Sequence, residues 1–153
     1  MEEAVIKRIL PHSTEAESAV IGAMLMNKDA ILETTEILTG EDFYQTAYGI
    51  LFDAMAELFH MGKPVDLITL QEHLKEKNVP PEVSSLEFAK DILAGFQTSA
   101  NAKAYAQIIK EKATLRRLIK LNEEIANTCY LENRPLEEIL EMTKRILHIY
   151  DEA

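Results

Sequence analysis

The last third of the chain carries the clearest pattern of hydrophobic positions. Two rows with spacings of three and four residues run through it, separated by a break at about residues 131–134. The first row is Leu115, Leu118, Asn122, Ile125 and Cys129. The second row is Leu136, Ile139, Thr143, Ile146 and Tyr150. Because this heptad spacing is typical of helices that pack side by side, the pattern predicts a helical hairpin.

Further apolar residues flank both rows, namely Ile119, Ala126, Leu140 and Leu147. A narrow seam between two helices does not need them, so each helix is predicted to offer a face wide enough for a second neighbour. Such a hairpin is a candidate site for pairing with another copy of the chain. The alternative, that all these side chains are used within one hairpin, stays open. The candidate dimer contacts are the large apolar residues of both helices: Leu115, Leu118, Ile119, Ile125, Leu136, Ile139, Leu140, Ile146 and Leu147.

The long helix that begins near residue 101 changes its apolar face along its length. At about 100° per residue, Ala102, Ala106 and Ile109 point one way, whereas Leu115 and Leu118 point to a different side. The first half is therefore expected to pack on the rest of the chain. The second half is expected to pack on the final helix.

Helix-capping residues divide the earlier part of the chain into about five short helices. Ser13 or Thr14 can accept the free amides at the start of the first helix, and Thr14-x-x-Glu17 fits a capping box there. Asp29 can cap a second helix that runs to about Leu38. Thr46 and Asp66 can cap the third and fourth.

Ser84-Ser85-Leu86-Glu87 fits a second capping box, which opens the fifth helix, and Gln97-Thr98-Ser99 can cap the long helix. In the loop Glu41-Asp42-Phe43-Tyr44, both aromatic side chains are expected to fill the core. No alternating strand of useful length occurs, so the fold is predicted to be all-α. Its expected parts are an N-terminal arm (1–12), a helical head (13–97), and a long helix with a C-terminal antiparallel hairpin (98–153).

The charge of the chain is acidic overall but uneven along it. A net charge of −10 argues against a domain whose main task is to hold nucleic acid phosphates. Six basic residues nevertheless cluster in the long helix, namely Lys103, Lys110, Lys112, Arg116, Arg117 and Lys120. They form either a solvated helix flank or an electrostatic surface for an acidic partner, a second hairpin or a nucleic acid strand.

No catalytic, metal or cofactor site emerges from the residues. The four histidines lie far apart in sequence, and Cys129, on a heptad row, is expected to be a small buried hydrophobic residue. A phosphate-binding G-x-x-x-x-G-K-[ST] loop is excluded, because the one Gly-Lys pair, Gly62-Lys63, precedes Pro64. The chain has no apolar run long enough to span a membrane and no apolar leader. These features indicate a non-catalytic helical interaction module.

Several segments together resemble the N-terminal domain of bacterial replicative DNA helicases of the hexameric DnaB type. In chain order these segments are Leu10-Pro11-His12-Ser13, Glu15-Ala16-Glu17, Glu41-Asp42-Phe43-Tyr44, Gly62-Lys63-Pro64-Val65-Asp66, Ser99-Ala100-Asn101-Ala102 and Tyr105-Ala106 with Ile108-Ile109. The resemblance covers nearly the whole chain in the right order. It implies a helical head and a hairpin, with hairpins that pair into homodimers and three pairs that form the collar of a hexamer.

The resemblance also implies partners and a location. The C-terminal helical domain of primase docks on the collar in that family, and a helicase loader acts on the same enzyme. A RecA-like motor domain that binds ATP and magnesium would follow residue 153, encircle single-stranded DNA and unwind the fork. This chain would then hold no cofactor, and the complete protein would work in the bacterial cytoplasm.

Two other functions remain open at this point. The chain could bind single-stranded DNA directly through its basic residues, although it lacks the interleaved aromatic residues of a base-stacking platform. It could also be a stand-alone helical adaptor. A phosphate-binding loop encoded beyond residue 153 would separate the helicase from the adaptor.

Overall fold

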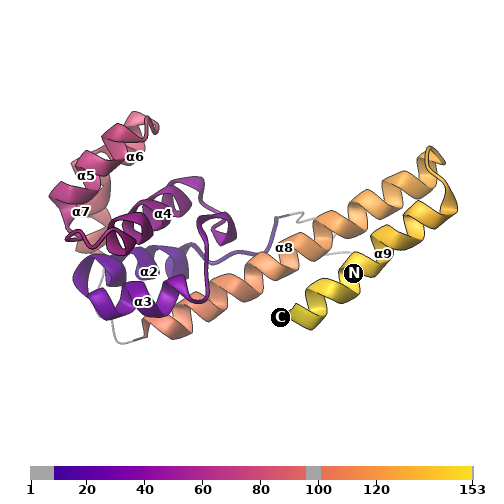
Figure 1. Cartoon of the computed structure of the whole chain (residues 1–153), viewed down its shortest axis with the longest axis horizontal. Helices are drawn as coiled ribbons and strands as arrows, with labels where there is room; N and C mark the ends of the chain where they lie inside the picture. Colours follow the sequence, from indigo (N-terminus) through magenta and orange to yellow (C-terminus); the bar gives the residue numbers. More distant parts are fainter. Residues whose placement is uncertain (1–8, 96–100, 153) are drawn as a thin grey trace. The chain divides into compact units, whose positions relative to one another are not determined.

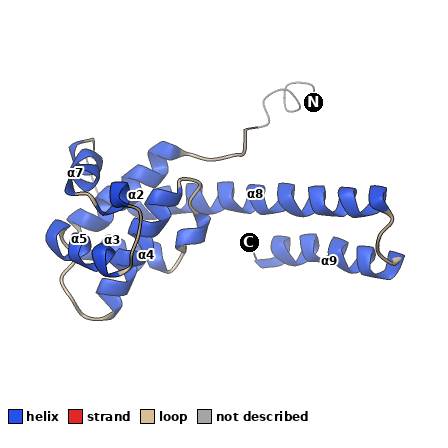
Figure 2. Ribbon diagram, turned by 90° about the horizontal axis from the view of Figure 1, so that it is seen from above, coloured by secondary structure: helices blue, strands red, loops and turns tan. Residues whose placement is uncertain are grey.

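The computed structural model describes residues 9–95 and 101–152, and these residues form helices without a strand (Figure 1; Figure 2). The prediction of an all-α fold is therefore confirmed. The helices are α2 (Thr14–Met26), α3 (Lys28–Thr35), the short 3-10 turn η1 (Gly40–Asp42), α4 (Thr46–His60), α5 (Leu67–Glu76), α6 (Pro81–Ser84), α7 (Leu86–Ala94), α8 (Ala102–Leu131) and α9 (Leu136–Glu152). Within the described ranges, no helix is both long and apolar enough to cross a membrane.

The chain divides into two compact units. One unit, here called the head, is His12–Lys110, and the other combines, among the described residues, 9–11 with 111–152. The division falls inside α8, beyond the expected boundary at residues 97 and 98 and close to the predicted change of apolar face between Ile109 and Leu115. The predicted cap at Gln97-Thr98-Ser99 lies outside the described residues.

Ser13, rather than a Thr14–Glu17 capping box, begins α2. The Ser13 side chain accepts a hydrogen bond from the Ala16 amide at 3.2 Å. Glu17 is buried and accepts hydrogen bonds from the backbone amides of Tyr44 (2.9 Å) and Gln45 (3.0 Å). These amides lead into α4, where the unpaired N–H groups of a helix start favour an acceptor. The predicted cap at Ser13 is therefore confirmed, whereas the capping box was wrong, because Glu17 bonds to amides at the start of α4.

Two further helix starts differ from the sequence-based expectation, by two residues for α3 and by one residue for α4. Asn27 caps α3 by accepting a hydrogen bond from the Asp29 amide at 2.9 Å, so Asp29 lies in the first turn instead of at the cap. Helix α3 also ends at Thr35, before Leu38. The predicted cap at Thr46 was wrong as well, because Thr46 is the first residue of α4.

The loop that contains η1 packs closely on α4. A Cβ atom on Gly40 would lie 2.6 Å from the carbonyl oxygen of Gly49, so this approach requires glycine. The Gly40 amide donates to Asp53 at 2.9 Å. Phe43 fills the core beside Phe52, with ring centroids 5.1 Å apart. Tyr44 was also predicted to fill the core, and this prediction was wrong.

The ring of Tyr44 is partly exposed and stacks on His12, with ring centroids 4.0 Å apart. Its backbone amide, held by Glu17, turns the chain toward α4. The surface position of the ring therefore follows from the direction in which this loop leaves the core.

Helices α5, α6 and α7 complete the head. Asp66 caps α5 as predicted, with a reciprocal pair of bonds between Asp66 and Thr69. Ser85 caps α7 by accepting from the Phe88 amide at 3.2 Å. Helix α6 was missed, because Pro80-Pro81 reads as a break although proline is favourable at the first helical position.

The first part of α8 belongs to the head. Ala106 and Ile109 are buried in the same core cluster as Val20, Phe52 and Leu70. The expected packing of this half of the long helix on the rest of the chain is therefore confirmed. Its small alanine side chains allow a close approach of backbones.

Candidate association surface

Beyond Glu111, α8 lies side by side with α9, which runs back in the opposite direction, in both views (Figure 1; Figure 2). This pair of helices is called the hairpin from here on. The residues that are buried or half-buried along both helices repeat at spacings of three and four. They form an inner seam of Leu118, Leu121, Ile125 and Thr128 from α8 with Ile139, Met142, Ile146 and Ile149 from α9.

This seam corrects the two heptad rows predicted from the sequence. Asn122, Cys129 and Thr143 are exposed, whereas Leu121 and Met142 are sheltered. Leu121 and Asn122 both fit a spacing of three and four residues on α8, and Met142 and Thr143 both fit it on α9. The rows predicted from the sequence therefore mixed residues from two adjacent faces of each helix. Cys129 is consequently an exposed side chain and not the small buried hydrophobic residue that was expected.

A second apolar stripe remains exposed beside the seam. The exposed fractions are 39% for Leu115, 70% for Leu136, 53% for Leu140 and 66% for Leu147. Ile119 is half-buried. The stripe is called the outer face and comprises Leu115, Ile119, Asn122, Ala126 and Cys129 of α8 with Leu136, Leu140, Thr143 and Leu147 of α9.

The two halves of the outer face lie on one side of the hairpin. At 100° per residue, each stripe is rotated from its own seam by roughly 100–110° in the same sense when each helix is viewed from its own N-terminus. The seams point toward each other and the helices run in opposite directions. Equal rotations therefore bring both stripes to the same side, which makes one continuous and largely apolar surface.

The nine predicted dimer contacts thus separate into two groups. Leu118, Ile125, Ile139 and Ile146 belong to the inner seam. Leu115, Ile119, Leu136, Leu140 and Leu147 belong to the outer face. The first group holds the hairpin together, and the second group is available to a neighbour.

Exposed apolar residues also mark the turn between the helices, which the sequence reasoning did not single out. Tyr130 and Leu131 are exposed at the end of α8, beside Leu136. Glu132 closes the helix in a left-handed conformation, with φ of 49°. In the turn, the Arg134 guanidinium lies 3.9 Å from the sulfur of Met142. The signal available in the sequence was the occurrence of Tyr130, Leu131 and Leu136 close together around the turn.

The structure does not gather the six predicted basic residues on one face. At 100° per residue, their positions span about half of the circumference of α8. Lys110 lies 3.5 Å from the buried carboxylate of Asp42, and Arg116 donates to the carbonyl oxygen of Pro11 at 2.8 Å. The Arg117 guanidinium donates to Thr114 at 3.3 Å. At least two of the six cations therefore have structural roles inside their own unit.

The remaining three, Lys103, Lys112 and Lys120, lie far apart along α8. Lys103 and Lys120 are exposed, and Lys112 is half-buried. A shared electrostatic surface stays a prediction, and the geometry offers it little support.

The head contains one ionic cluster that joins α4 to α5. Glu57 lies 2.8 Å from the His73 imidazole and 2.9 Å from the Lys77 ammonium group. The Lys77 hydrogen bond lowers the pKa of Glu57, partial burial opposes this shift, and His73 adds to it. These contacts tie the two helices together on the surface of the head. Among the described residues, no group of histidine, cysteine or carboxylate side chains is arranged to hold a metal ion.

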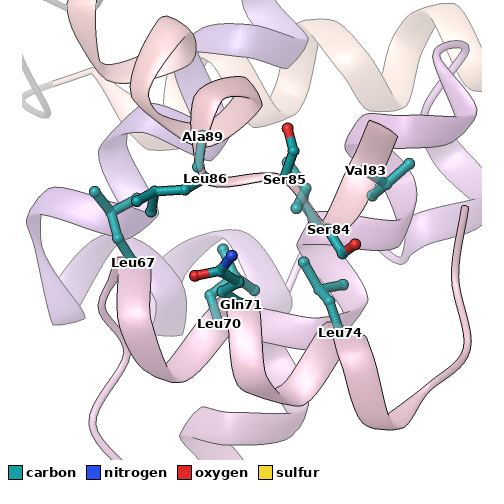
Figure 3. Close-up of a pocket in the computed structure, with 10 residues that line it drawn as sticks. Leu67, Leu70, Gln71, Leu74, Val83, Ser84, Ser85, Leu86 and Ala89 are labelled. Atoms are coloured by element: carbon teal, nitrogen blue, oxygen red, sulfur yellow. The ribbon is translucent and has the colours of Figure 1, made fainter. Parts of the chain in front are cut away.

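A small gap lies between α5, α6 and α7 (Figure 3). The side chains of Leu67, Leu70 and Leu74 line one wall, and Val83 and Leu86 line the opposite wall. Its volume is about 10 Å³, which is near the minimum for one water molecule. The gap is therefore too small to hold a ligand.

Comparison of the sequence with known families gives a consistent result. Residues 9–111 match the profile of the "DnaB-like helicase N terminal domain". The chain is 35% identical to the replicative DNA helicase DnaB of Geobacillus stearothermophilus over 145 residues, which is 95% of this chain and 32% of that protein. It is 34% identical to the replicative DNA helicase DnaC of Bacillus subtilis, over 97% of this chain and 33% of the relative. The chain thus spans about a third of the relatives it matches.

Solved structures show the same fold. The N-terminal domain of DnaB helicase from Mycobacterium tuberculosis superimposes with a TM-score of 0.84 at 29% identity, over 92% of this chain and 99% of that chain. The corresponding domain from Helicobacter pylori, described together with its interactions with primase, gives a TM-score of 0.65 at 24% identity over 75% of this chain and 89% of that chain. The second similarity concerns the fold alone.

Proposed function

Because the chain belongs to the DnaB-like helicase N-terminal domain family, we propose that it is the oligomerisation and primase-recruiting domain of a replicative DNA helicase. The observation that carries this proposal is the outer face of the hairpin. Its leucines are exposed in the isolated chain, and contiguous apolar surface of this kind marks an interaction site. A second copy of the chain is the proposed occupant.

The energetics favour pairing through the whole face and not through one residue. Fully burying a leucine side chain contributes about 1.5–3 kcal/mol. Four partly exposed leucines from each of two copies would supply on the order of 10 kcal/mol. Association costs about 4–15 kcal/mol, so Ile119 and Ala126 must contribute as well. A pair that uses the same patch on both copies is closed and self-limiting.

Replacement of Leu140 by glutamate tests this pairing. The variant places two like charges in the proposed interface, so the dimer dissociation constant is expected to rise at least about 100-fold. Sedimentation velocity at micromolar concentration would then show monomers. The control is Asn127→Glu, which adds the same charge on the solvent side of α8. Equal sedimentation of the wild-type chain and Leu140→Glu would contradict pairing through this face.

The complete protein, in this proposal, unwinds duplex DNA at the replication fork with ATP and magnesium in a motor domain beyond this chain. The sequence here contains no phosphate-binding loop of the G-x-x-x-x-G-K-[ST] type. Three paired hairpins would form the collar of a hexamer that encircles single-stranded DNA. A helicase loader would act on the same assembly in the bacterial cytoplasm.

Primase recruitment is supported by the description of the H. pylori domain with its interactions with primase. The proposed partner is the C-terminal helical domain of the primase from the same organism. Calorimetric titration of that domain into the chain is expected to give saturable heat. A titration without heat, together with unchanged sedimentation of the mixture, would remove this part of the function and leave the pairing intact.

A further inference from the structure

The apolar outer face contains two polar side chains other than its cysteine, and both lie near its middle. Asn122 is seven residues from Leu115 and seven from Cys129, while Thr143 lies between Leu140 and Leu147. Asn122 is nine residues before the end of α8, and Thr143 is seven residues after the start of α9. At 1.5 Å per residue, their heights along the hairpin differ by about 3 Å. The two side chains, one on each helix at nearly the same level, are called the polar spot near the centre of the face.

Each polar side chain is already bonded to its own helix. The Asn122 amide donates to the Leu118 carbonyl oxygen at 2.7 Å, and the Thr143 hydroxyl donates to the Ile139 carbonyl oxygen at 3.1 Å. A side-chain amide has a second N–H donor and an oxygen that accepts two bonds, and a hydroxyl oxygen can also accept. The spot can therefore be exposed in one chain and still take hydrogen bonds from another.

We propose that Asn122, assisted by Thr143, sets the register in which two copies of the hairpin pair. This inference rests on the pairing proposed above. In a two-fold symmetric dimer the centre of the shared patch meets its own equivalent. The two Asn122 amides can then donate to and accept from each other or the Thr143 hydroxyls.

A slipped register would place the polar spot of one copy against leucines of the other. The amide would then lose its contact with water without gaining a partner, which disfavours that arrangement. A single asparagine within an apolar helical interface has this effect in coiled coils, where it fixes register and oligomeric state at a cost in stability. None of the nine residues of the outer face is charged, so ion pairs within the face cannot fix the register instead.

Replacement of Asn122 by leucine tests the inference, with Asn127→Leu as the matched control. Asn127 is exposed on the side of α8 away from both the seam and the outer face. Each chain carries a spin label on cysteine introduced by Glu141→Cys, in a Cys129→Ala background. Sedimentation equilibrium gives the dimer dissociation constant, and pulsed electron paramagnetic resonance gives the distance between the two labels.

The spin-labelled chain that keeps Asn122 and Asn127, called the unsubstituted pair, is expected to form a dimer with one narrow distance between its two labels. Asn122→Leu is expected to bind about tenfold more tightly and to show more than one distance, whereas Asn127→Leu matches the unsubstituted pair. A dimer whose affinity and single distance do not change in Asn122→Leu would overturn the inference while leaving the pairing intact. Equal changes in both variants would overturn it too. A monomeric unsubstituted chain would overturn the pairing, and the inference with it.

Discussion

The head and the hairpin shelter their apolar side chains in different ways. In the head, Val20, Ile21 and Leu51 are fully buried within a single chain. Among the described residues from Glu111 onward, Ala113 and Met142 are the only buried hydrophobic residues, and several leucines are mostly exposed. The head therefore has a core of its own, whereas the hairpin buries one of the two apolar faces it carries.

Buried polar groups differ between the regions as well. In the head, the carboxylates of Glu17 and Asp42 are buried and bonded to backbone amides. In the hairpin, the polar side chains of Asn122 and Thr143 bond to their own helix and are exposed. The head is therefore specified by contacts within the chain. The hairpin leaves an apolar face exposed, which a second chain would cover in the proposed dimer.

The largest expected effect on folding is that of Phe52→Ala. Phe52 is buried against Phe43 in the head core, so its truncation is expected to lower the free energy of unfolding by about 3–5 kcal/mol. Urea denaturation followed by circular dichroism measures the change. Leu147→Ala, on the outer face, is the contrast and should change the unfolding of the monomer by less than about 1 kcal/mol. Similar losses in both variants would break the distinction between a closed head and an open hairpin.

A smaller effect is expected for Glu17→Gln. Glutamine keeps one acceptor oxygen but turns an N–H₂ group toward an amide donor, so one of the two bonds to Tyr44 and Gln45 is lost. The expected loss is about 1–3 kcal/mol in the free energy of unfolding. The control is Glu15→Gln in the exposed first turn of α2. An equal, small change in both variants would show that the buried carboxylate does not organise the start of α4.

The smallest expected effect is that of Glu57→Gln, and it depends on pH. The pKa of Glu57 is lower in the folded protein, mainly because of Lys77. Its contribution to stability is therefore present above the ordinary carboxyl range of about 4.3 and is lost as the pH falls through the folded pKa. Because the side chain of Glu57 is 47% exposed, the loss at pH 7 should stay below about 1 kcal/mol.

Urea denaturation of Glu57→Gln and of the wild-type chain at pH 7 and about pH 3 measures this difference. The two proteins should converge at the lower pH, where the wild-type carboxyl group is protonated. Glu72→Gln is the control, because Glu72 has an exposed contact with Lys75. A difference between wild type and Glu57→Gln that grows toward low pH would contradict the assignment.

Local signals in the sequence were sufficient where the partner of a residue lies nearby in the chain. The cap at Asp66 and the all-α class follow from spacing alone. Ser85 also caps α7, but without the capping box that was predicted for Ser84-Ser85-Leu86-Glu87. Glu17 could not be placed, because its amide partners lie 27 and 28 residues away. The local spacing fits a capping box between Thr14 and Glu17 as well as it fits the observed bonds to Tyr44 and Gln45.

The hairpin shows the same limit for a helical face. The three–four spacing identified both helices, but it did not decide between Leu121 and Asn122 or between Met142 and Thr143 for the seam. The choice depends on how α8 and α9 face each other, which no single helix encodes. The flanking apolar residues had indicated a second face, but the residues that make up this outer face could be assigned only when the inner seam was known.

Isotope-filtered nuclear magnetic resonance of a mixture of labelled and unlabelled chains tests the pairing most directly. Methyl groups of Leu115, Leu136, Leu140 and Leu147 in the labelled copy are expected to show contacts with protons of the unlabelled copy at micromolar to millimolar concentration. Methyl groups of the inner seam and of the head core should show contacts within their own chain. The absence of contacts between copies, or contacts confined to the head, would contradict the assignment of the outer face to a second copy.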